Sequence, residues 1–98
     1  MDDPQEAAKG ANVLYTDVWS SMGEENQKEE KDKNFEGFTI DNNLVRVASK
    51  NAIVLHCLPA YRNKEITDEV FESKISRIFQ QAENRLHVQQ ALLSCLIQ

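Results

Sequence analysis

Two short, unbroken runs of apolar residues constrain the fold of this chain most. They are Val13-Leu14-Tyr15 and Ala52-Ile53-Val54-Leu55. Unbroken apolar runs of this length are typical of strands that are covered on both faces, as in parallel sheets. The 36 residues from 16 to 51 separate the two runs, which leaves room for a crossover connection with one or two helices. The sequence therefore predicts an α/β fold with parallel strands.

A third run, from Ile75 to Phe79, is a weaker strand candidate. With it, the predicted fold is a partial open parallel sheet of about three strands with flanking helices. A chain of 98 residues allows one small domain at most. A parallel sheet of this size would leave two uncovered edges. We therefore expect residues 1–98 to form a single partial domain, a piece of a larger one.

Polar, helix-prone segments separate and follow these runs. Asp41 is a predicted N-cap for a helix from Asn42 to Ser49, and Thr67 precedes another predicted helical turn. The densely charged segment 24–36 is typical of a solvated helix or loop. The last helix is predicted to start near Ala82 and to end near Ile97. Its apolar side forms a broad arc that should face a core: Leu86, Val88, Leu92, Leu93, Cys95, Leu96 and Ile97.

Arg85 lies within this apolar arc, in the first turn of the last predicted helix. A guanidinium directed inward at a helix N-terminus favours an anion there, because the terminal N–H groups also attract one. The alternative is an ion pair with Glu83 or another carboxylate, and spacing alone leaves both open. His87 is on the polar side and is predicted to face solvent.

Composition excludes several kinds of function. The formal charge of −5, from 16 acidic and 11 basic residues, argues against a general nucleic-acid or anionic-membrane surface. No apolar run approaches the roughly 20 residues of a membrane span. The two cysteines are 38 positions apart, so no C-x-x-C pair exists. Nucleotide-binding glycine loops and histidine pairs with metal-ligand spacing are also absent. We expect a reduced cytoplasmic protein, with an organelle as the alternative, and no cofactor.

Polar groups follow each apolar run. Asp17 comes after the first, His56 and Cys57 end the second, and a polar segment from Gln80 to Arg85 follows the third. Ligands of open α/β sheets bind beyond the carboxyl ends of the strands, which share one edge when the strands are parallel. We therefore expect a carboxylate, an imidazole, a thiol and a guanidinium around one crevice. Each has a simpler alternative: Asp17 as a cap, and His56 and Cys57 as core residues.

Four sequence motifs add a family resemblance to this pattern. Residues 17–23 have the form D-x-x-x-S-M-G, residues 56–59 are H-C-L-P, and T-D-E-V at 67–70 and A-E-N-R at 82–85 follow in order. This series resembles the C-terminal part of ornithine carbamoyltransferase from about Ala8 to Leu96. H-C-L-P alone would indicate carbamoyltransferases broadly, whereas S-M-G after Y-T-D-x-W is more specific. The resemblance implies a Rossmann-like half-domain from the ornithine-binding domain.

The resemblance also implies an activity. The family transfers the carbamoyl group of carbamoyl phosphate to the δ-amino group of L-ornithine, giving citrulline and phosphate in arginine and urea-cycle metabolism. It needs no metal or organic cofactor, and its members are homo-oligomers, at least trimers. By resemblance, Asp17 would pair with the α-ammonium of ornithine. Ser21 and Met22 would shape the site around the α-amino-acid end, and Cys57 would lie beside the side-chain amine.

The same resemblance assigns carbamoyl phosphate to three residues. His56 would donate to its carbonyl oxygen, the backbone carbonyl of Leu58 would accept from its NH2 group, and Arg85 would help to hold it. A cis Leu58–Pro59 bond would aim the Leu58 carbonyl. His56, Cys57 and Arg85 are thus the predicted catalytic residues.

The chain departs from the family in one large respect. The S-x-R-T loop and the H-P-x-Q segment that bind carbamoyl phosphate in the family's other domain do not occur here. We therefore expect a fragment, a partial gene product or a degenerate copy that is inactive alone. One alternative is a relative that acts on acylated ornithine, suggested by Arg62-Asn63, or on putrescine. Another is a non-catalytic binding module.

Overall fold

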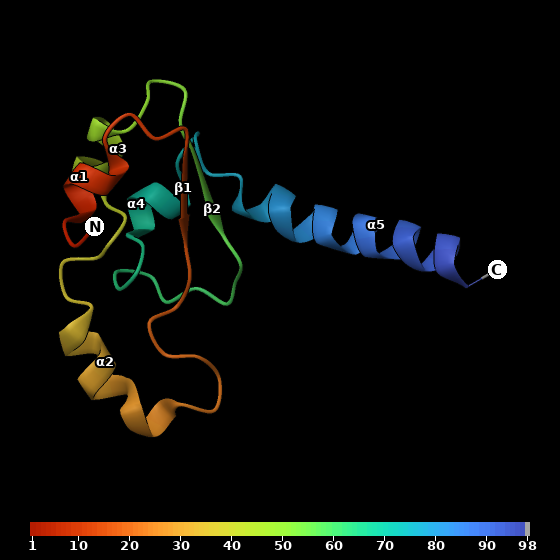
Figure 1. Ribbon diagram of the computed structural model, residues 1–98, viewed down its shortest axis with the longest axis horizontal. Coiled ribbons are helices and arrows are strands. Elements are labelled where there is room, and N and C mark those ends of the chain that lie inside the picture. The colour runs from red at the N-terminus through yellow and green to blue at the C-terminus, as the bar shows by residue number, and fades with distance from the viewer. Residues whose placement is uncertain (98) are drawn as a thin grey trace.

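The computed structural model describes residues 1–97. Two strands, β1 and β2, pair in parallel, and helices precede, connect and follow them (Figure 1). In chain order the elements are α1 (Pro4–Ala8), β1 (Val13–Thr16), the 3-10 helix η1 (Glu25–Gln27), α2 (Lys28–Asn34), α3 (Asn42–Val47), β2 (Ile53–His56), α4 (Asp68–Phe71) and α5 (Ile78–Leu96). The predicted α/β class and parallel pairing are confirmed.

The predicted third strand at Ile75–Phe79 is reduced in the structure to a single bridge. Ser76 makes a single parallel bridge to Val54, on the edge of β2 that β1 does not use. The Val54 N–H donates to the Ile75 carbonyl at 3.0 Å, and the Arg77 N–H donates to the Val54 carbonyl at 2.9 Å. The chain then turns directly into α5 at Ile78, where Gln-Gln-Ala-Glu provides good helix formers. Within residues 1–97 the sheet thus has two strands and one added bridge.

The core lies between one face of the sheet and the helices that pack against that face. In Figure 1, α1, α3 and α4 all lie on the same side of the two strands, while α5 extends away from the other side. The buried side chains come from every part of this arrangement: Ala8, Leu14, Ile40, Leu44, Val54, Ile66, Val70, Phe71 and Ile78. Val54, Ile66 and Ile78 are completely buried. The apolar runs of the sequence therefore hold the sheet against this helical layer.

The short helices begin where the capping residues predict. The Leu44 N–H donates to Asp41 Oδ1 at 2.8 Å, and the Val70 N–H donates to Thr67 Oγ1 at 3.4 Å. These side chains satisfy backbone donors that the first turn of α3 and α4 leaves free. The charged segment 24–36 forms two consecutive pieces, η1 and α2, with no fully buried residue.

The last helix differs from the prediction in both its start and its surroundings. It begins at Ile78, so Arg85 lies inside the helix and not in its first turn, and a helix N-terminus does not contribute an anion site there. Apart from Ile78 and half-buried Gln81, its residues are exposed, and Leu96 is 71% exposed. Cys95 is also exposed, contrary to the predicted core position. His87 faces solvent as predicted, 3.2 Å from Glu83.

The apolar arc of α5 was predicted from spacing, which defines a face but not the element that covers it. Among the described residues, nothing covers that face beyond the first turns. None of the helices in this part of the chain combines the length and the apolar character that crossing a membrane requires.

We expect Ile66→Val to lower the free energy of unfolding by about 1 kcal/mol, because it removes one methyl group from a fully buried side chain. Ile97→Val is the matched control, since Ile97 is 75% exposed and the same deletion there should change little. Urea unfolding followed by circular dichroism measures both. Equal midpoints for the two variants would contradict the assigned core.

Candidate functional site

Asp17 and Cys57 meet at the carboxyl edge of the sheet. Thr16, the last residue of β1, pairs with His56, the last residue of β2, so the residues that follow leave the sheet at the same level. The Cys57 thiol donates to Asp17 Oδ1 with an S–O distance of 2.9 Å, across 40 residues of sequence. The Val18 N–H donates to the same oxygen at 2.7 Å. The parallel pairing therefore brings these two predicted site residues into direct contact.

The contact shifts the acid–base behaviour of both groups. The Cys57 hydrogen bond, followed by that of the Val18 N–H, lowers the pKa of Asp17, because both favour the ionised carboxylate. Partial burial, and then the hydrogen bond to the Asp17 carboxylate, raise the pKa of Cys57. The folded state thus favours a neutral thiol beside an ionised carboxylate. The thiol's contribution to stability is lost as the pH rises through its folded-state pKa.

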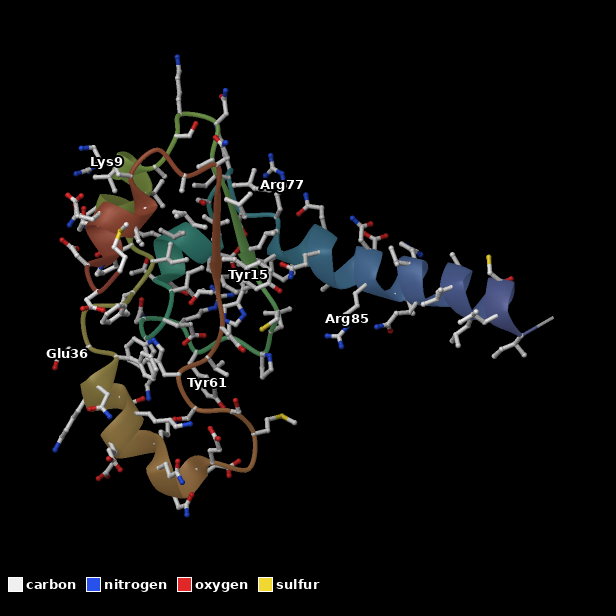
Figure 2. The ribbon with its side chains drawn as sticks, viewed as in Figure 1. Lys9, Tyr15, Glu36, Tyr61, Arg77 and Arg85 are labelled. Atoms are coloured by element: carbon white, nitrogen blue, oxygen red, sulfur yellow. The ribbon has the colours of Figure 1, made fainter. Side chains whose placement is uncertain are left out.

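Arg85 reaches the same edge from α5. A groove of about 520 Å³ is lined by Tyr15, His56, Cys57, Gln81, Ala82, Asn84, Arg85 and Val88. The positive charge of Arg85 slightly opposes the upward shift of the Cys57 pKa, which places the guanidinium within electrostatic reach of the thiol. Figure 2 shows Tyr15 beside the strands and Arg85 projecting from the proximal half of α5. The structure therefore brings together carboxylate, thiol and guanidinium.

Gln81 ties the three elements of this groove to one another. Its Oε1 accepts from the His56 N–H at 3.0 Å, and its Nε2 donates to the Tyr15 hydroxyl at 2.9 Å. It precedes Arg85 by four residues and so lies on the same face of α5. Gln81 lies in the polar segment that the sequence indicated, where it had no predicted role, and its helical spacing from Arg85 was the available signal.

His56 has a different set of partners from the one the family resemblance implied. Its ring is buried, with Nδ1 accepting from the Leu58 N–H at 2.8 Å and Nε2 lying 2.8 Å from Glu65 Oε1. A nitrogen that accepts carries no proton, so the ring's single N–H is the one on Nε2, which donates to Glu65. While these bonds are kept, no ring N–H is free for a substrate. Leu58 is in the left-handed region at φ 59°, and the Leu58–Pro59 bond is cis.

Ser21 and Met22 lie on a separate part of the surface. The Ser21 N–H donates to Glu24 Oε2 at 3.2 Å, and the Gly23 N–H donates to Glu25 Oε1 at 3.1 Å, which fixes the turn through the S-M-G motif. Met22 is 82% exposed. Both residues border a small cavity with Tyr61 and not the groove at Cys57. The structure thus does not bring them together with Cys57 and Arg85.

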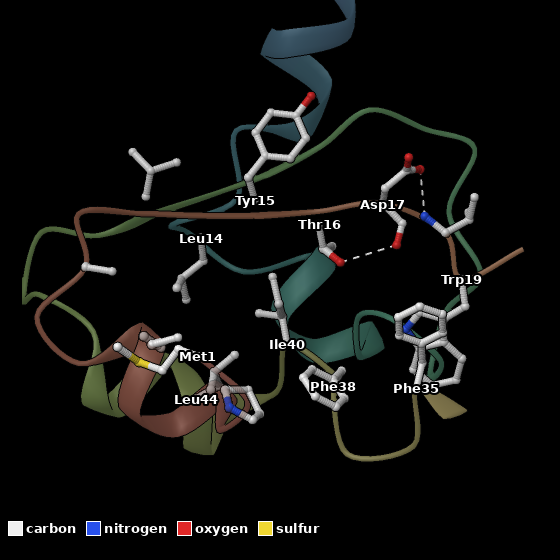
Figure 3. A pocket seen from close by; sticks show the side chains of 16 residues that line it. Met1, Leu14, Tyr15, Thr16, Asp17, Trp19, Phe35, Phe38, Ile40 and Leu44 are labelled. Carbon is white, nitrogen blue, oxygen red and sulfur yellow. Dashed lines mark hydrogen bonds between the residues drawn. The ribbon is translucent and has the colours of Figure 1, made fainter. Parts of the chain in front are cut away.

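A cavity of about 550 Å³ lies along β1 and is mostly apolar (Figure 3). Leu14, Ile40 and Leu44 line it, and Phe35, Phe38 and Trp19 lie toward one end. Asp17 is its one acidic residue. Among the described residues, no strand pairs with this edge of β1 and no cluster of three metal-ligating side chains occurs. The cavity is therefore suited to hydrophobic packing more than to polar chemistry.

The carboxylate, the thiol and the guanidinium thus lie at the carboxyl edge of parallel strands, which is where open α/β proteins bind their ligands. The profile of the family described as aspartate/ornithine carbamoyltransferase, Asp/Orn binding domain, matches residues 1–96. The chain belongs to this family, which confirms the resemblance found in the motifs.

Individual relatives agree with this assignment. An ornithine carbamoyltransferase of Prochlorococcus marinus subsp. pastoris is 79% identical over 96 residues, which are 98% of this chain and 31% of the relative. The crystal structure of anabolic ornithine carbamoyltransferase from Campylobacter jejuni has a TM-score of 0.87 and 54% identity, covering 96% of this chain and 31% of its own. A structure of N-acetyl-L-ornithine transcarbamylase has a TM-score of 0.79 and 32% identity over 98% of this chain and 30% of its own. The chain thus spans less than a third of the length of these relatives.

We expect Asp17→Asn to increase the rate of Cys57 alkylation near pH 8, because removing the carboxylate charge returns the thiol pKa toward its ordinary value. Iodoacetamide labelling with mass spectrometry resolves the two cysteines. Exposed Cys95 is the internal control, and its rate should be the same in both proteins. An unchanged or slower reaction at Cys57 would show that Asp17 does not govern the thiol.

Proposed function

We propose that residues 1–98 form the ornithine-binding part of an ornithine carbamoyltransferase. The reaction transfers a carbamoyl group from carbamoyl phosphate to L-ornithine, giving citrulline and phosphate for arginine biosynthesis. The observation that carries the proposal is the Cys57–Asp17 hydrogen bond in a groove shared with Arg85. The family match and the names of the relatives support ornithine as the amino acid.

Ornithine binding would use the Asp17 carboxylate for the α-ammonium group and the half-buried thiol of Cys57 for the side-chain amine. Asp17 is ionised, exposed and suited to pair with the α-ammonium group. Cys57 is a neutral, half-buried thiol beside it, next to which the side-chain amine would lie. The attacking amine must be a free base, and partial exclusion of water from the site favours loss of its proton. Ser21 and Met22 would approach the α-amino-acid end by movement of their exposed loop.

Carbamoyl phosphate would be held at the same edge by Leu58 and Arg85, with His56 acting indirectly. The Leu58 backbone carbonyl would accept from the carbamoyl NH2 group, and the Arg85 guanidinium would stabilise the phosphate and the negative charge that develops during transfer. His56, expected to donate to the carbonyl oxygen, would contribute through the loop it holds, because both its ring nitrogens are engaged. No step in this scheme requires a metal or an organic cofactor.

The chain alone is proposed to be inactive, since neither S-x-R-T nor H-P-x-Q occurs in its 98 residues. Carbamoyl phosphate would bind only with a domain that supplies these motifs, within a homotrimer. The apolar cavity along β1 is a suitable surface for packing against further parts of that protein. Two unpaired cysteines agree with a reducing compartment, for which we propose the cytoplasm.

The acylated-ornithine alternative has weaker support in the structure. Arg62, one of the residues that suggested it, forms ion pairs with Asp68 at 2.6 Å and Glu72 at 2.7 Å and stacks on Phe71. Asn63 accepts from the Asp68 N–H at 3.1 Å. These contacts give both residues a structural role near α4, and the likeness to the acetylornithine enzyme is also lower in identity. A non-catalytic binding module remains the alternative from a different class, and turnover tests it.

The sharpest test transfers this chain into the 79%-identical Prochlorococcus enzyme in place of its matching segment. We expect the chimera to carbamoylate L-ornithine in preference to N-acetylornithine and putrescine. Asp17→Asn in the chimera should lower kcat/KM for ornithine by about 30-fold or more, because it removes one partner of a charge pair.

Asp2→Asn, at an exposed residue near the N-terminus, is the matched control and should leave kcat/KM unchanged. The unmodified 98-residue chain should show no turnover. A chimera that folds and binds ornithine without turnover would favour the binding module, and preference for N-acetylornithine would favour the other transferase.

A further inference from the structure

A buried hydrogen bond between a histidine and a carboxylate holds the proposed catalytic loop. Glu65 and His56 are the two buried polar or charged residues of the described chain, at 0% and 1% exposure. Burying a carboxylate is costly unless hydrogen-bond donors surround it. Glu65 Oε1 has two: His56 Nε2 at 2.8 Å and the Tyr61 N–H at 2.8 Å. The carboxylate therefore holds both ends of the segment 56–61.

The position of Glu65 is itself fixed by backbone pairing. The Ile40 N–H donates to the Glu65 carbonyl at 2.9 Å, and the Thr67 N–H donates to the Ile40 carbonyl at 3.1 Å. Thr39 Oγ1 donates to the neighbouring Lys64 carbonyl at 2.6 Å. Ile66, the next residue, is completely buried. Glu65 is thus anchored in the core side of the fold while its side chain reaches the loop after β2.

The His56 ring connects Glu65 to Leu58, because each ring nitrogen contacts one of them. Because Nε2 keeps the ring proton and donates it to Glu65 Oε1, Nδ1 carries no proton and accepts from the Leu58 N–H at 2.8 Å. The acceptor holds Leu58 at φ 59°, a conformation that a leucine rarely adopts. The opposite tautomer would place a proton on Nδ1 facing the Leu58 N–H and remove this bond. One proton placement therefore pairs both ring nitrogens with Glu65 Oε1 and the Leu58 N–H, whereas the buried Glu65 Oε2 has no hydrogen-bond partner among the described residues.

We propose that Glu65 is a positioning residue for carbamoyl transfer: by fixing His56 in the Nε2–H tautomer, it holds Cys57 and the Leu58 carbonyl in their working geometry. The effect of Glu65 on carbamoyl transfer rests on the proposed function, whereas its effect on the His56 tautomer does not. Glu65 touches no groove residue other than His56 among its hydrogen-bond partners, so its effect is transmitted through that ring. Neither the charge pattern nor the motifs of the sequence indicated this residue.

The structural part is tested in the 98-residue chain with ¹⁵N-labelled histidine. His87→Gln leaves His56 as the single histidine, and long-range ¹H–¹⁵N spectra show which ring nitrogen carries the proton. We expect only Nε2–H at neutral pH and slow exchange of the Leu58 and Tyr61 amides. Protonation of Nδ1, or a mixture of tautomers, in this otherwise unmodified chain would overturn the proposal without any change at Glu65.

Variants at Glu65 test whether this residue determines the His56 tautomer and the slow exchange of the two amides. Glu65→Ala should allow both tautomers and speed exchange of the Leu58 and Tyr61 amides by at least tenfold, a loss typical of removing a fixed hydrogen bond. Glu65→Gln keeps an acceptor oxygen in place and should preserve the tautomer and the slow exchange. Circular dichroism establishes whether each variant is folded. A folded Glu65→Ala chain with unchanged tautomer and exchange would contradict the proposal.

The catalytic part is tested in the chimera with the Prochlorococcus enzyme. We expect Glu65→Ala to reduce kcat by about 10²-fold, as misplacement of a catalytic loop does, with a much smaller change in KM for ornithine. Glu65→Gln should restore most of kcat. Equal losses in both variants, or a loss confined to KM, would overturn the positioning role. An inactive unmodified chimera would instead contradict the proposed function and leave the tautomer measurement to decide on Glu65.

Discussion

The register of the parallel pair β1–β2 determines where every group of the candidate site lies. Thr16 is opposite His56, so Asp17 and Cys57 are the first residues beyond the sheet on adjacent strands. A shift of one residue would exchange the faces on which their side chains emerge and separate the thiol from the carboxylate. The register is in turn held by burial of Leu14 and Val54 on the face that contacts the helices. Hydrophobic packing on one face of the sheet thus determines how Asp17 and Cys57 are placed at its carboxyl edge.

Much of the fold and site could be predicted because local patterns encode it. Two apolar runs with a long connection indicated parallel strands, and residues directly after them had to share an edge. Asp41 and Thr67 identified helix starts through their own side chains. The motifs at 17–23 and 56–59 identified the family, which the profile match confirms. The roles of individual residues in binding ornithine and carbamoyl phosphate stay predictions.

The parts that sequence analysis missed depend on contacts between distant segments. Ile75–Phe79 has the composition of a strand, but its pairing with Val54 ends after one bridge and Ile78 already starts a helix. The apolar arc of α5 showed a face without showing whether anything covers it. The partners of His56 depend on the turn between Arg62 and Ile66, which brings Glu65 to the ring. No periodicity or spacing indicates this contact.

The chain has a single tryptophan, and its place gives the molecule an internal optical reporter. Trp19 stacks on Phe35 with ring centroids 6.3 Å apart, and so joins the segment leading into the S-M-G turn to the end of α2. An indole that leaves an aromatic partner for water emits at longer wavelength. A motion that carries the S-M-G turn toward the groove would change the stacking of Trp19 on Phe35. A shift in the wavelength of the Trp19 fluorescence would therefore report this motion without any added label.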